Sequence, residues 1–377
     1  MSSVPRLRRL APALLAVAAL GCATGRGARM AAPPAQEIAF HEPTVIEPRP
    51  EDADLATRND EELFAIGTAA YQAGEHARAA ASFGRLADEF PASRRVPAAL
   101  YDAGLAWRQL DRWDLALERF RQLAEGYTGP DANEASFFVA EALYRLGRHP
   151  EARALLDRLA ARTDLEPAQH VRALTQRGVV ELEDGEPQIA ERSLQLAISA
   201  WQAAEQRERL EDAYPAKARF YLGEVYRSYF EALRLDPSST GEDALGKQLE
   251  EKAQLLLAAQ NHYLRAVRAG DAAWAVAAGA RVGELYDALY RQLVEAPLPA
   301  ALDEEHARVY RDELRGRVRV LVTKAIVAYE ETLSAARRAG VDNAFVPRTE
   351  EALARMRRIL ADDDARSAAE PGPGSGG

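Results

Sequence analysis

The stretch ELFAIGTAAYQAGEHARAAASFGRLADEFP, residues 62–91, contains a pattern that recurs at least twice more in the chain. The further copies are ALYDAGLAWRQLDRWDLALERFRQLAEGY at 99–127 and SFFVAEALYRLGRHPEARALLDRLA at 136–160. Each copy has a small residue early, a turn in the middle, and then an alanine followed four residues later by a large apolar residue. Self-similarity at a period of about 20–50 residues is typical of stacked helical units. The stretch therefore predicts an all-α repeat fold.

Aligning the copies extends the register to a fourth, weaker unit. The units start near Asp60, Pro97, Asn133 and Val171. The early small residue, which lets the two helices of a unit approach closely, is Gly67, Gly104, Ala140 and Gly178. The mid-helix alanine is Ala79, Ala116, Ala152 and Ala190, and the large residue after it is Phe83, Phe120, Leu156 and Leu194. Where the first helix must end, a left-handed residue is expected at Gly74, Asp111, Gly147 and Gly185.

This combination resembles the tetratricopeptide repeat (TPR). The first two units are similar to those of envelope TPR proteins of the BamD and YbgF/CpoB types, through Phe90-Pro91 and the run Tyr101-x-x-Gly104-x-Ala-Trp107. The resemblance covers about residues 60–200. It implies a TPR α-solenoid of antiparallel helix pairs and a role in binding other proteins. A generic helical bundle is the alternative.

The first 21 residues predict an export signal. Three arginines within the first nine residues precede a short apolar run, Leu10–Leu20. This run is shorter than the roughly 20 apolar residues of a membrane-spanning helix, and a basic start followed by a short apolar segment is typical of a signal peptide. We therefore expect residues 1–21 to be removed from the mature protein.

The residues before the only cysteine, Ala19-Leu20-Gly21-Cys22, resemble the lipobox of bacterial lipoproteins. That resemblance implies that Cys22 is lipidated and becomes the first residue of the mature chain. Ala23, rather than aspartate, follows the cysteine, which by resemblance to the enterobacterial sorting rule favours the outer membrane, with the protein facing the periplasm. An ordinary signal peptide with a fortuitous cysteine is the alternative.

The rest of the chain divides by composition. Residues 22–58 are rich in alanine, proline and glutamate and predict an extended tether. Residues 59–200 hold the repeats. Residues 201–362 predict longer helices, either continuing the α-solenoid or forming a small antiparallel bundle, with a short last helix at about 349–361. Residues 363–377 are Gly/Pro/Ser-rich and predict a disordered tail.

The sequence offers little catalytic chemistry. The six histidines are scattered, and none lies in an HExxH motif or a close Cys/His cluster suited to zinc. Carboxylates mostly alternate with arginines, which fits surface pairing along helices. The formal net charge of −10 argues against a non-specific nucleic-acid binder. We therefore predict a protein that is not an enzyme, with no catalytic residues, metal or cofactor and no nucleic-acid partner.

What remains is a binding surface. In TPR proteins, fixed positions of the first helix of each repeat line the concave wall, and the resemblance carries these positions onto this chain. The implied peptide-binding residues are Phe64, Thr68, Tyr71, Tyr101, Leu105, Arg108, Phe137, Glu141, Tyr144 and Arg172. Aromatic side chains with a few arginines are typical of protein-binding hot spots. The alternative is that these aromatics cover neighbouring helices.

Together these features favour a non-enzymatic, lipid-anchored TPR scaffold in the bacterial envelope. Its partners would be envelope proteins or an extended peptide, in assembly, Tol-linked, secretion or motility machinery, and the lipid would hold it on the membrane. Two other hypotheses stay open. One is an envelope enzyme or glycan-binding accessory that uses the C-terminal helical half; the other is a TPR-type secretin pilotin.

Overall fold

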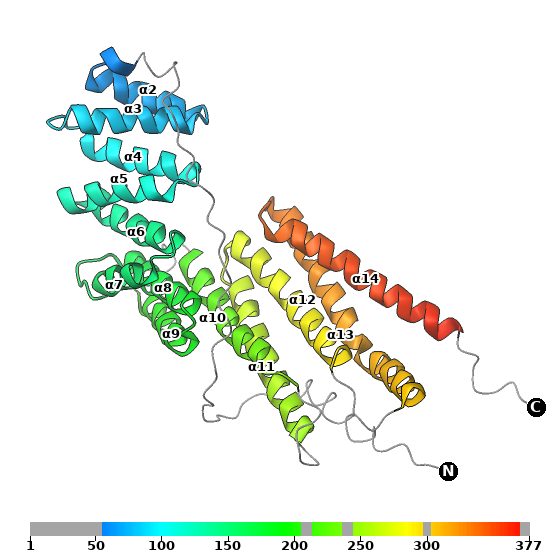
Figure 1. Ribbon diagram of the computed structural model, residues 1–377. Coiled ribbons are helices and arrows are strands. Elements are labelled where there is room, and N and C mark those ends of the chain that lie inside the picture. The colour runs from blue at the N-terminus through cyan, green and yellow to red at the C-terminus, as the bar shows by residue number, and fades with distance from the viewer. Residues whose placement is uncertain (1–54, 205–212, 236–243, 297–302, 370–377) are drawn as a thin grey trace, which may run out of the picture. The chain divides into compact units, whose positions relative to one another are not determined.

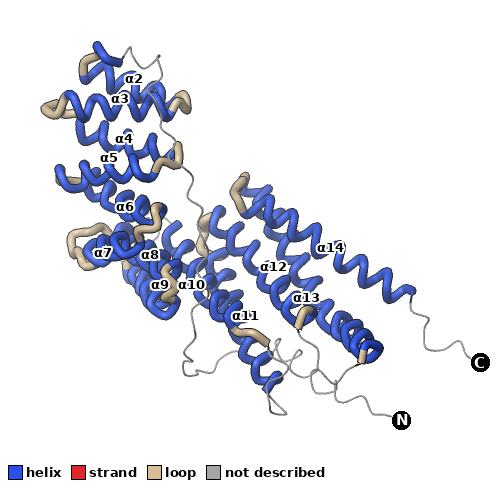
Figure 2. The backbone as a smooth tube through the Cα atoms, in the orientation of Figure 1, coloured by secondary structure: helices blue, strands red, loops and turns tan. Residues whose placement is uncertain are grey.

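The computed structural model describes residues 55–204, 213–235, 244–296 and 303–369, and side chains in the last segment as far as residue 366. All regular elements in these ranges are helices, as Figure 2 shows by colour. The described residues form two compact units, which we call the first unit (55–186) and the second unit (187–369). The prediction of an all-α fold of helix pairs that continues into longer helices is confirmed.

The first unit holds three complete helix pairs and the first helix of a fourth (Figure 1). Its helices are α2 (Asp60–Gln72), α3 (His76–Glu89), α4 (Val96–Gln109), α5 (Trp113–Gly126), α6 (Pro130–Arg145), α7 (His149–Ala160) and α8 (Pro167–Glu183). The second unit holds longer helices. They are α9 (Pro187–Ala203), α10 (Ala213–Ala232), α11 (Ala244–Val267), α12 (Ala272–Val294), α13 (Glu304–Ala339) and α14 (Phe345–Ala369).

The local signals at the helix ends explain these boundaries. Asn59 caps α2 with a capping box: its side chain accepts a hydrogen bond from the Glu62 amide, and the Glu62 carboxylate accepts one from the Asn59 amide. The turns after α2, α6 and α8 have glycine at positive φ, and Asp111 adopts φ 57° in the corresponding place after α4. The predicted left-handed positions, given as Gly74, Asp111, Gly147 and Gly185, are therefore confirmed.

Close contact between a glycine and an aromatic ring sets the spacing of the helix pairs α2–α3 and α4–α5 in the first unit. Gly67 lies against Phe83 and Gly104 lies against Phe120, so closely that a Cβ atom on either glycine would overlap the ring. Both rings are buried, and burying a phenylalanine side chain contributes about 1.5–3 kcal/mol. The early small residue thus does what the sequence pattern predicted.

The same contact recurs in the second unit. Gly223 of α10 lies against Tyr263 of α11, and Gly283 of α12 lies against Tyr329 of α13. Both tyrosines are fully buried, and each follows a fully buried alanine by four residues, as the large residue does in the first unit. These alanines are Ala259 and Ala325. The pairs α10–α11 and α12–α13 therefore keep the packing rule of the repeats.

The second unit differs in the number of residues between each glycine and the ring that it contacts. From glycine to ring the chain advances 16 residues in Gly67–Phe83 and Gly104–Phe120, but 40 residues in Gly223–Tyr263 and 46 in Gly283–Tyr329. Part of the extra length extends the start of the second helix: α11 begins 19 residues before Tyr263, and α13 begins 25 residues before Tyr329. The helix pairs are lengthened at their tips, where the glycine contact is not disturbed.

A buried ionic cluster joins the helices of the second unit. Glu224, next to Gly223, accepts a hydrogen bond from the Tyr263 hydroxyl and pairs with Arg227 and Arg281 at 2.6 and 2.9 Å. Burial by itself raises the pKa of Glu224, but the two arginines outweigh it and hold that pKa below its ordinary value. The carboxylate therefore stays ionised inside the protein and links α10 to α11 and α12.

Helix α14 closes the second unit. Its buried face packs on α12 and α13, and Arg355 pairs with the buried Asp287 of α12 at 2.6 Å. That face consists of Thr349, Ala352, Leu353 and Met356. Its exposed residues are mostly charged and include Glu350, Glu351, Arg357 and Arg358, of which Arg357 pairs with Glu330 of α13 at 2.7 Å. A helix with a polar outer face is what caps the end of a repeat array.

The compact units divide after Glu186, between the two helices of the predicted fourth repeat, and the extent of the repeats, 59–200, stays a prediction. One predicted boundary differs from the structure. The predicted last helix, 349–361, is too short, and residues 363–369 of the predicted tail are helical. At its start the helix is longer because Phe345 packs on the core of the second unit, and beyond residue 361 Asp364 pairs with Arg319 of α13 and Arg366 pairs with Asp363.

The predicted signal peptide, Cys22 and the tether as far as residue 54 lie outside the described residues, as do residues 370–377 of the predicted tail. In the part of the chain that the structure describes, no helix combines the length and hydropathy needed to cross a bilayer.

The glycine contacts allow a direct test within the second unit. We expect Gly283→Ala to lower the free energy of unfolding by about 1–3 kcal/mol, because the added methyl group overlaps the Tyr329 ring. Gly316→Ala on α13 is the matched control: no atom lies near its Cβ position, so alanine should raise stability by up to about 1 kcal/mol. Urea unfolding followed by circular dichroism measures both, and equal effects would contradict the packing rule.

Candidate functional site

The first helices of successive repeats form one wall of the first unit. Helix α4 contacts α6, and α6 contacts α8. At the start of this wall, Arg95 before α4 pairs with Glu61 of α2 at 3.0 Å. Positions repeated from helix to helix therefore lie on a common surface, which we call the helix-A face.

On α2, the three predicted groove residues are half-buried. The Phe64 ring lies edge-on to Phe83, with ring centroids 5.5 Å apart, and the Arg95 guanidinium lies 5.3 Å from the Phe64 centroid. Thr68 donates a hydrogen bond to the Phe64 carbonyl, and Tyr71 lies edge-on to His76. Each side chain thus uses part of its surface within the fold and leaves part accessible.

On α4, Tyr101 and Arg108 reach across to the next repeat. Tyr101 is edge-on to Phe138 of α6 at 5.8 Å, and to Phe120 of α5 at 6.1 Å. Arg108 lies over the same Phe138 ring and pairs with Glu141 of α6 at 3.6 Å. Together with the half-buried Leu105, these side chains make the central part of the helix-A face.

On α6, the prediction of Phe137 as a groove residue is wrong. Phe137 is 0% exposed and belongs to the core, so it has no surface to offer a partner. Its neighbour Phe138 is the ring that meets Tyr101 and Arg108. Phe138 is itself only 9% exposed and stacks on Phe120 at 4.8 Å, so both rings of the pair pack α6 against its neighbours.

Arg172 of α8 also has a different place from the predicted one. Only 8% of it is exposed, its guanidinium lies 4.6 Å from the Phe137 centroid and 5.4 Å from the Phe138 centroid, and it pairs with Glu134. Cation–π contacts with desolvated arginines contribute about 2 kcal/mol. Arg172 therefore braces α8 against α6, and does not line an open groove.

The remaining predicted residues, Glu141 and Tyr144, are half-buried on α6. Glu141 is held by Arg108, as described, and Tyr144 stacks on His149 at 5.6 Å. Burial raises the pKa of the Tyr144 hydroxyl, and the nearby Glu183 carboxylate raises it further. This hydroxyl remains a neutral donor throughout the physiological pH range.

Asp102, beside Tyr101, is a residue that the sequence pattern did not single out. Burial raises the pKa of its carboxyl group, and the carboxylate of Asp131 on α6 raises it further. Burial and then Glu134 likewise raise the pKa of Tyr101. The junction of α4 and α6 thus concentrates negative charge beside half-exposed aromatic rings, which suits a basic side chain of a bound partner.

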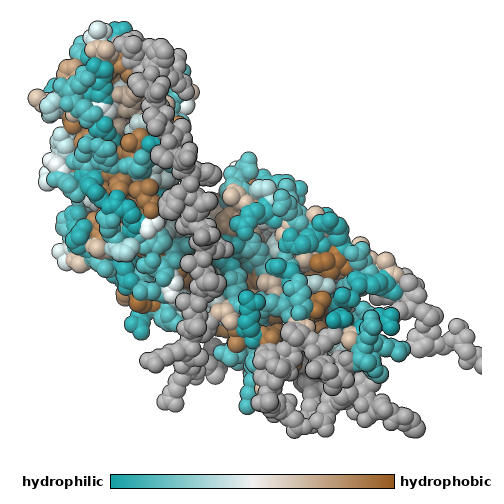
Figure 3. Space-filling model, in the orientation of Figure 1, coloured by the Kyte–Doolittle hydropathy of each residue, from teal (hydrophilic) through white to brown (hydrophobic). Residues whose placement is uncertain are grey.

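Chemically, the helix-A face combines rings, guanidinium groups and carboxylates that are partly exposed and already positioned by the fold. Such groups bind peptide side chains by stacking and by charge-assisted hydrogen bonds. Among the described residues, no three or more metal-ligating side chains gather in a geometry that could hold a metal ion. The space-filling view in Figure 3 shows hydrophobic residues on the visible face as patches bordered by hydrophilic ones.

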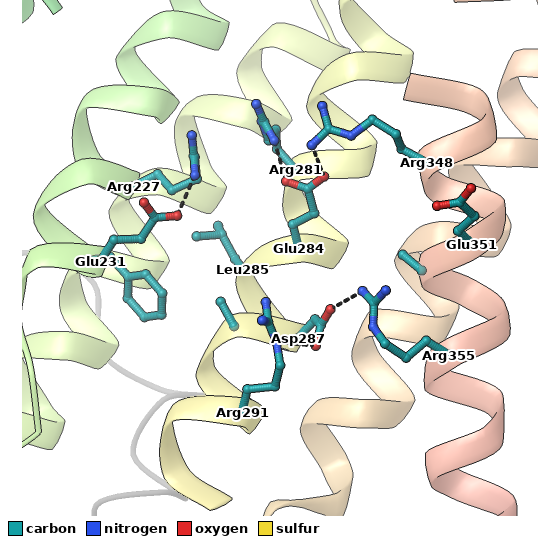
Figure 4. Close-up of a pocket in the computed structure, with 13 residues that line it drawn as sticks. Arg227, Glu231, Arg281, Glu284, Leu285, Asp287, Arg291, Arg348, Glu351 and Arg355 are labelled. Carbon is teal, nitrogen blue, oxygen red and sulfur yellow. Dashed lines mark hydrogen bonds and ion pairs between the residues drawn. The ribbon is translucent and has the colours of Figure 1, made fainter. Parts of the chain in front are cut away.

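A separate cavity of about 360 Å³ lies in the second unit, between α10, α12 and α14 (Figure 4). Its charged residues pair with one another. Arg227 pairs with Glu231, Arg281 and Arg348 pair with Glu284, and Arg291 and Arg355 pair with Asp287. Because its arginines are matched by carboxylates, this cavity offers an incoming ion little net charge and braces the helices.

The raised pKa of Asp102 gives a pH-dependent prediction. Its pKa is higher in the folded state than in the unfolded state, so ionisation costs stability as the pH rises through the folded pKa. Asp102→Asn should therefore stabilise the protein at pH 7, and the gain should shrink as the pH falls toward the unfolded pKa of about 3.9. Urea titrations between pH 4 and 7 test this. Glu118→Gln, at an exposed position of α5, is the control and should show no such trend. A gain in stability from Asp102→Asn that does not depend on pH would contradict the prediction.

Comparison with known proteins gives a family match over part of the chain. A family model described as tetratricopeptide repeat matches residues 64–118 and 101–170. No curated protein matches the sequence. Among solved structures, a tetratricopeptide repeat protein from Parabacteroides merdae has 15% sequence identity and a TM-score of 0.37, covering 79% of this chain and 98% of that one.

Two further solved structures are similar at the same level. A TPR repeats protein from Bacteroides fragilis has 14% identity and a TM-score of 0.30, covering 57% of this chain and 92% of that one. The apo form of RapI has 10% identity and a TM-score of 0.45, covering 80% and 99%. The tetratricopeptide repeat model thus matches this chain over residues 64–170, where the helix pairs pack through Gly67 and Gly104.

Proposed function

We propose that this protein is a lipid-anchored, non-enzymatic scaffold that binds a protein partner in the bacterial envelope. Tetratricopeptide repeats are suited to protein–protein interaction, because their stacked helices present long rows of fixed side chains. The observation that carries the proposal is the helix-A face. On it Tyr71, Tyr101 and Tyr144 are half-exposed on successive helices, and Arg108 is fixed between two of them.

The partner is an extended peptide or a segment of an envelope protein that lies along α2, α4 and α6. The rigid rings need little ordering on binding, which favours affinity. The carboxyl groups of Asp102 and Asp131 favour a basic side chain in the middle of that segment. The finer parts of the proposal are the outer-membrane location, the periplasmic orientation and the link to an assembly, Tol-linked, secretion or motility machine. They rest on the lipobox-like sequence at Cys22 and on the resemblance of the first repeats to BamD and YbgF/CpoB.

The binding part is tested with partners identified first by crosslinking the native protein in cells and by mass spectrometry. Tyr101→Ala with Tyr144→Ala should reduce capture of those partners at least about tenfold, because two central hot-spot side chains are lost. Glu118→Ala with Glu125→Ala, two exposed residues of α5, is the matched control and should leave capture unchanged. Thermal melting confirms that the variants fold, since Tyr101 also contacts core rings. Full capture by a folded double-tyrosine variant would show that the partner binds elsewhere.

The anchoring part is tested at Cys22. Replacing Cys22 by alanine should abolish lipid attachment, so that the N-terminal peptide of the mature protein no longer carries acyl mass and the protein leaves the membrane fraction. Mass spectrometry and carbonate-washed fractionation measure these outcomes. Thr24→Ala, two residues further along, should keep both the lipid and the membrane location. A native protein without acyl groups would contradict the proposal.

A further inference from the structure

A second cavity in the second unit differs in charge from the cavity between α10, α12 and α14, whose arginines pair with carboxylates. It has a volume of about 680 Å³, within the range of about 300–1,000 Å³ that is usual for small-molecule pockets, and lies between α9, α10 and α11. Three arginines contribute to it, Arg219 from α10 and Arg265 and Arg268 from α11 and its end. No aspartate or glutamate stands among its described lining residues. In a chain with a formal net charge of −10, this local excess of positive charge is unusual.

Two of these arginines have no carboxylate partner among the residues that the structure describes. Arg265 and Arg268 are exposed, stand on adjacent positions of one helix face, and form no ion pair with any residue that the structure describes. By contrast, the arginines of the cavity beside α14 each have a carboxylate partner. The free guanidinium groups therefore retain their full capacity to bind an anion.

Other residues that line the cavity are held in place by contacts within the fold and are partly buried. The Arg219 guanidinium lies 5.2 Å from the Trp201 centroid, and the His262 ring stacks on Tyr226 with centroids 5.1 Å apart. His262 Nδ1 is buried and has no hydrogen-bond partner among the described residues. Burial and then the charge of Arg265 lower the pKa of His262 to about 4. The imidazole is therefore neutral at pH 7, as expected beside uncompensated positive charge.

The number of arginines indicates the class of anion. A carboxylate carries one negative charge, whereas a phosphate monoester carries about 1.5 to 2 at pH 7 and has three acceptor oxygens. The planar guanidinium donates pairs of parallel hydrogen bonds that match phosphate oxygens. Ile198 and Leu222 add apolar surface for the organic part of such a molecule.

We propose that the cavity between α9, α10 and α11 binds the phosphate group of an organic phosphate, with Arg265 and Arg268 as its principal ligands. The source of that group is either a soluble phosphate ester or a lipid headgroup, which share this chemistry. The site lies apart from the helix-A face and does not depend on the scaffold proposed above.

The test uses the full mature chain in isothermal titration calorimetry at low salt, with inorganic pyrophosphate as the probe. We expect saturable binding at one site that weakens as salt is added. Arg265→Gln with Arg268→Gln should raise the dissociation constant at least about tenfold, because hydrogen bonds to charged groups contribute about 1.5–3 kcal/mol each. Both residues are exposed, and melting curves confirm that the variant folds.

The matched control is Arg308→Gln with Arg311→Gln on α13. It removes the same charge at the same spacing from an exposed helix in the same unit, outside the cavity. Unchanged binding by the control and weakened binding by the cavity variant support the proposal. No heat of binding at pyrophosphate concentrations of about 1 mM, or equal weakening in both variants, overturns it.

Two further probes separate the sources of the phosphate group. Glycerol 3-phosphate represents a soluble ester, and a short-chain phosphatidic acid represents a headgroup. Equal affinity for both, with both dependent on Arg265 and Arg268, supports a soluble ester as ligand. Tighter arginine-dependent binding of the phosphatidic acid supports a lipid headgroup. If either probe binds the native protein and the double arginine variant with equal affinity, the assignment of the site is overturned.

Discussion

The close approach of a glycine on one helix to a ring on the next is the contact on which the rest of the structure depends. It occurs at Gly67 and Gly104 in the first unit, and at Gly223 and Gly283 in the second. Because the glycine has no Cβ atom, the ring lies directly on the helix backbone, and the distance within the pair is set. Each pair then offers the next one a surface of constant geometry, so the first helices of the repeats align and their side chains form the helix-A face.

Much of the first unit could be predicted from the sequence, because its glycine, alanine and large apolar residue recur at constant spacing. The second unit was only partly predictable. Its rings stand 40 and 46 residues after their glycines, so reading at a fixed period misses them. A signal was present nonetheless: Gly-Glu-x-Tyr occurs at 223–226 and again at 283–286, and an alanine precedes both Tyr263 and Tyr329 by four residues.

At the candidate site, prediction from the sequence failed for individual residues. The position count placed Phe137 on the binding face, but Phe137 is fully buried, and Phe138, which meets Tyr101 and Arg108, is only 9% exposed. Both rings pack α6 against its neighbours, and a count of positions along one helix does not show which side chains those neighbours cover. Asp102 was missed for another reason, since its importance comes from Asp131 on a different helix, and such proximity is not written in local sequence.

The charged outer face of α14 has a consequence for assembly. Repeat arrays grow because each unit leaves an apolar face that the following unit covers, and an uncovered apolar face could equally be covered by another molecule. Here Glu350, Glu351, Arg357 and Arg358 occupy that position, so desolvation opposes stacking of a second molecule on α14. Helix α14 thus works against head-to-tail polymerisation.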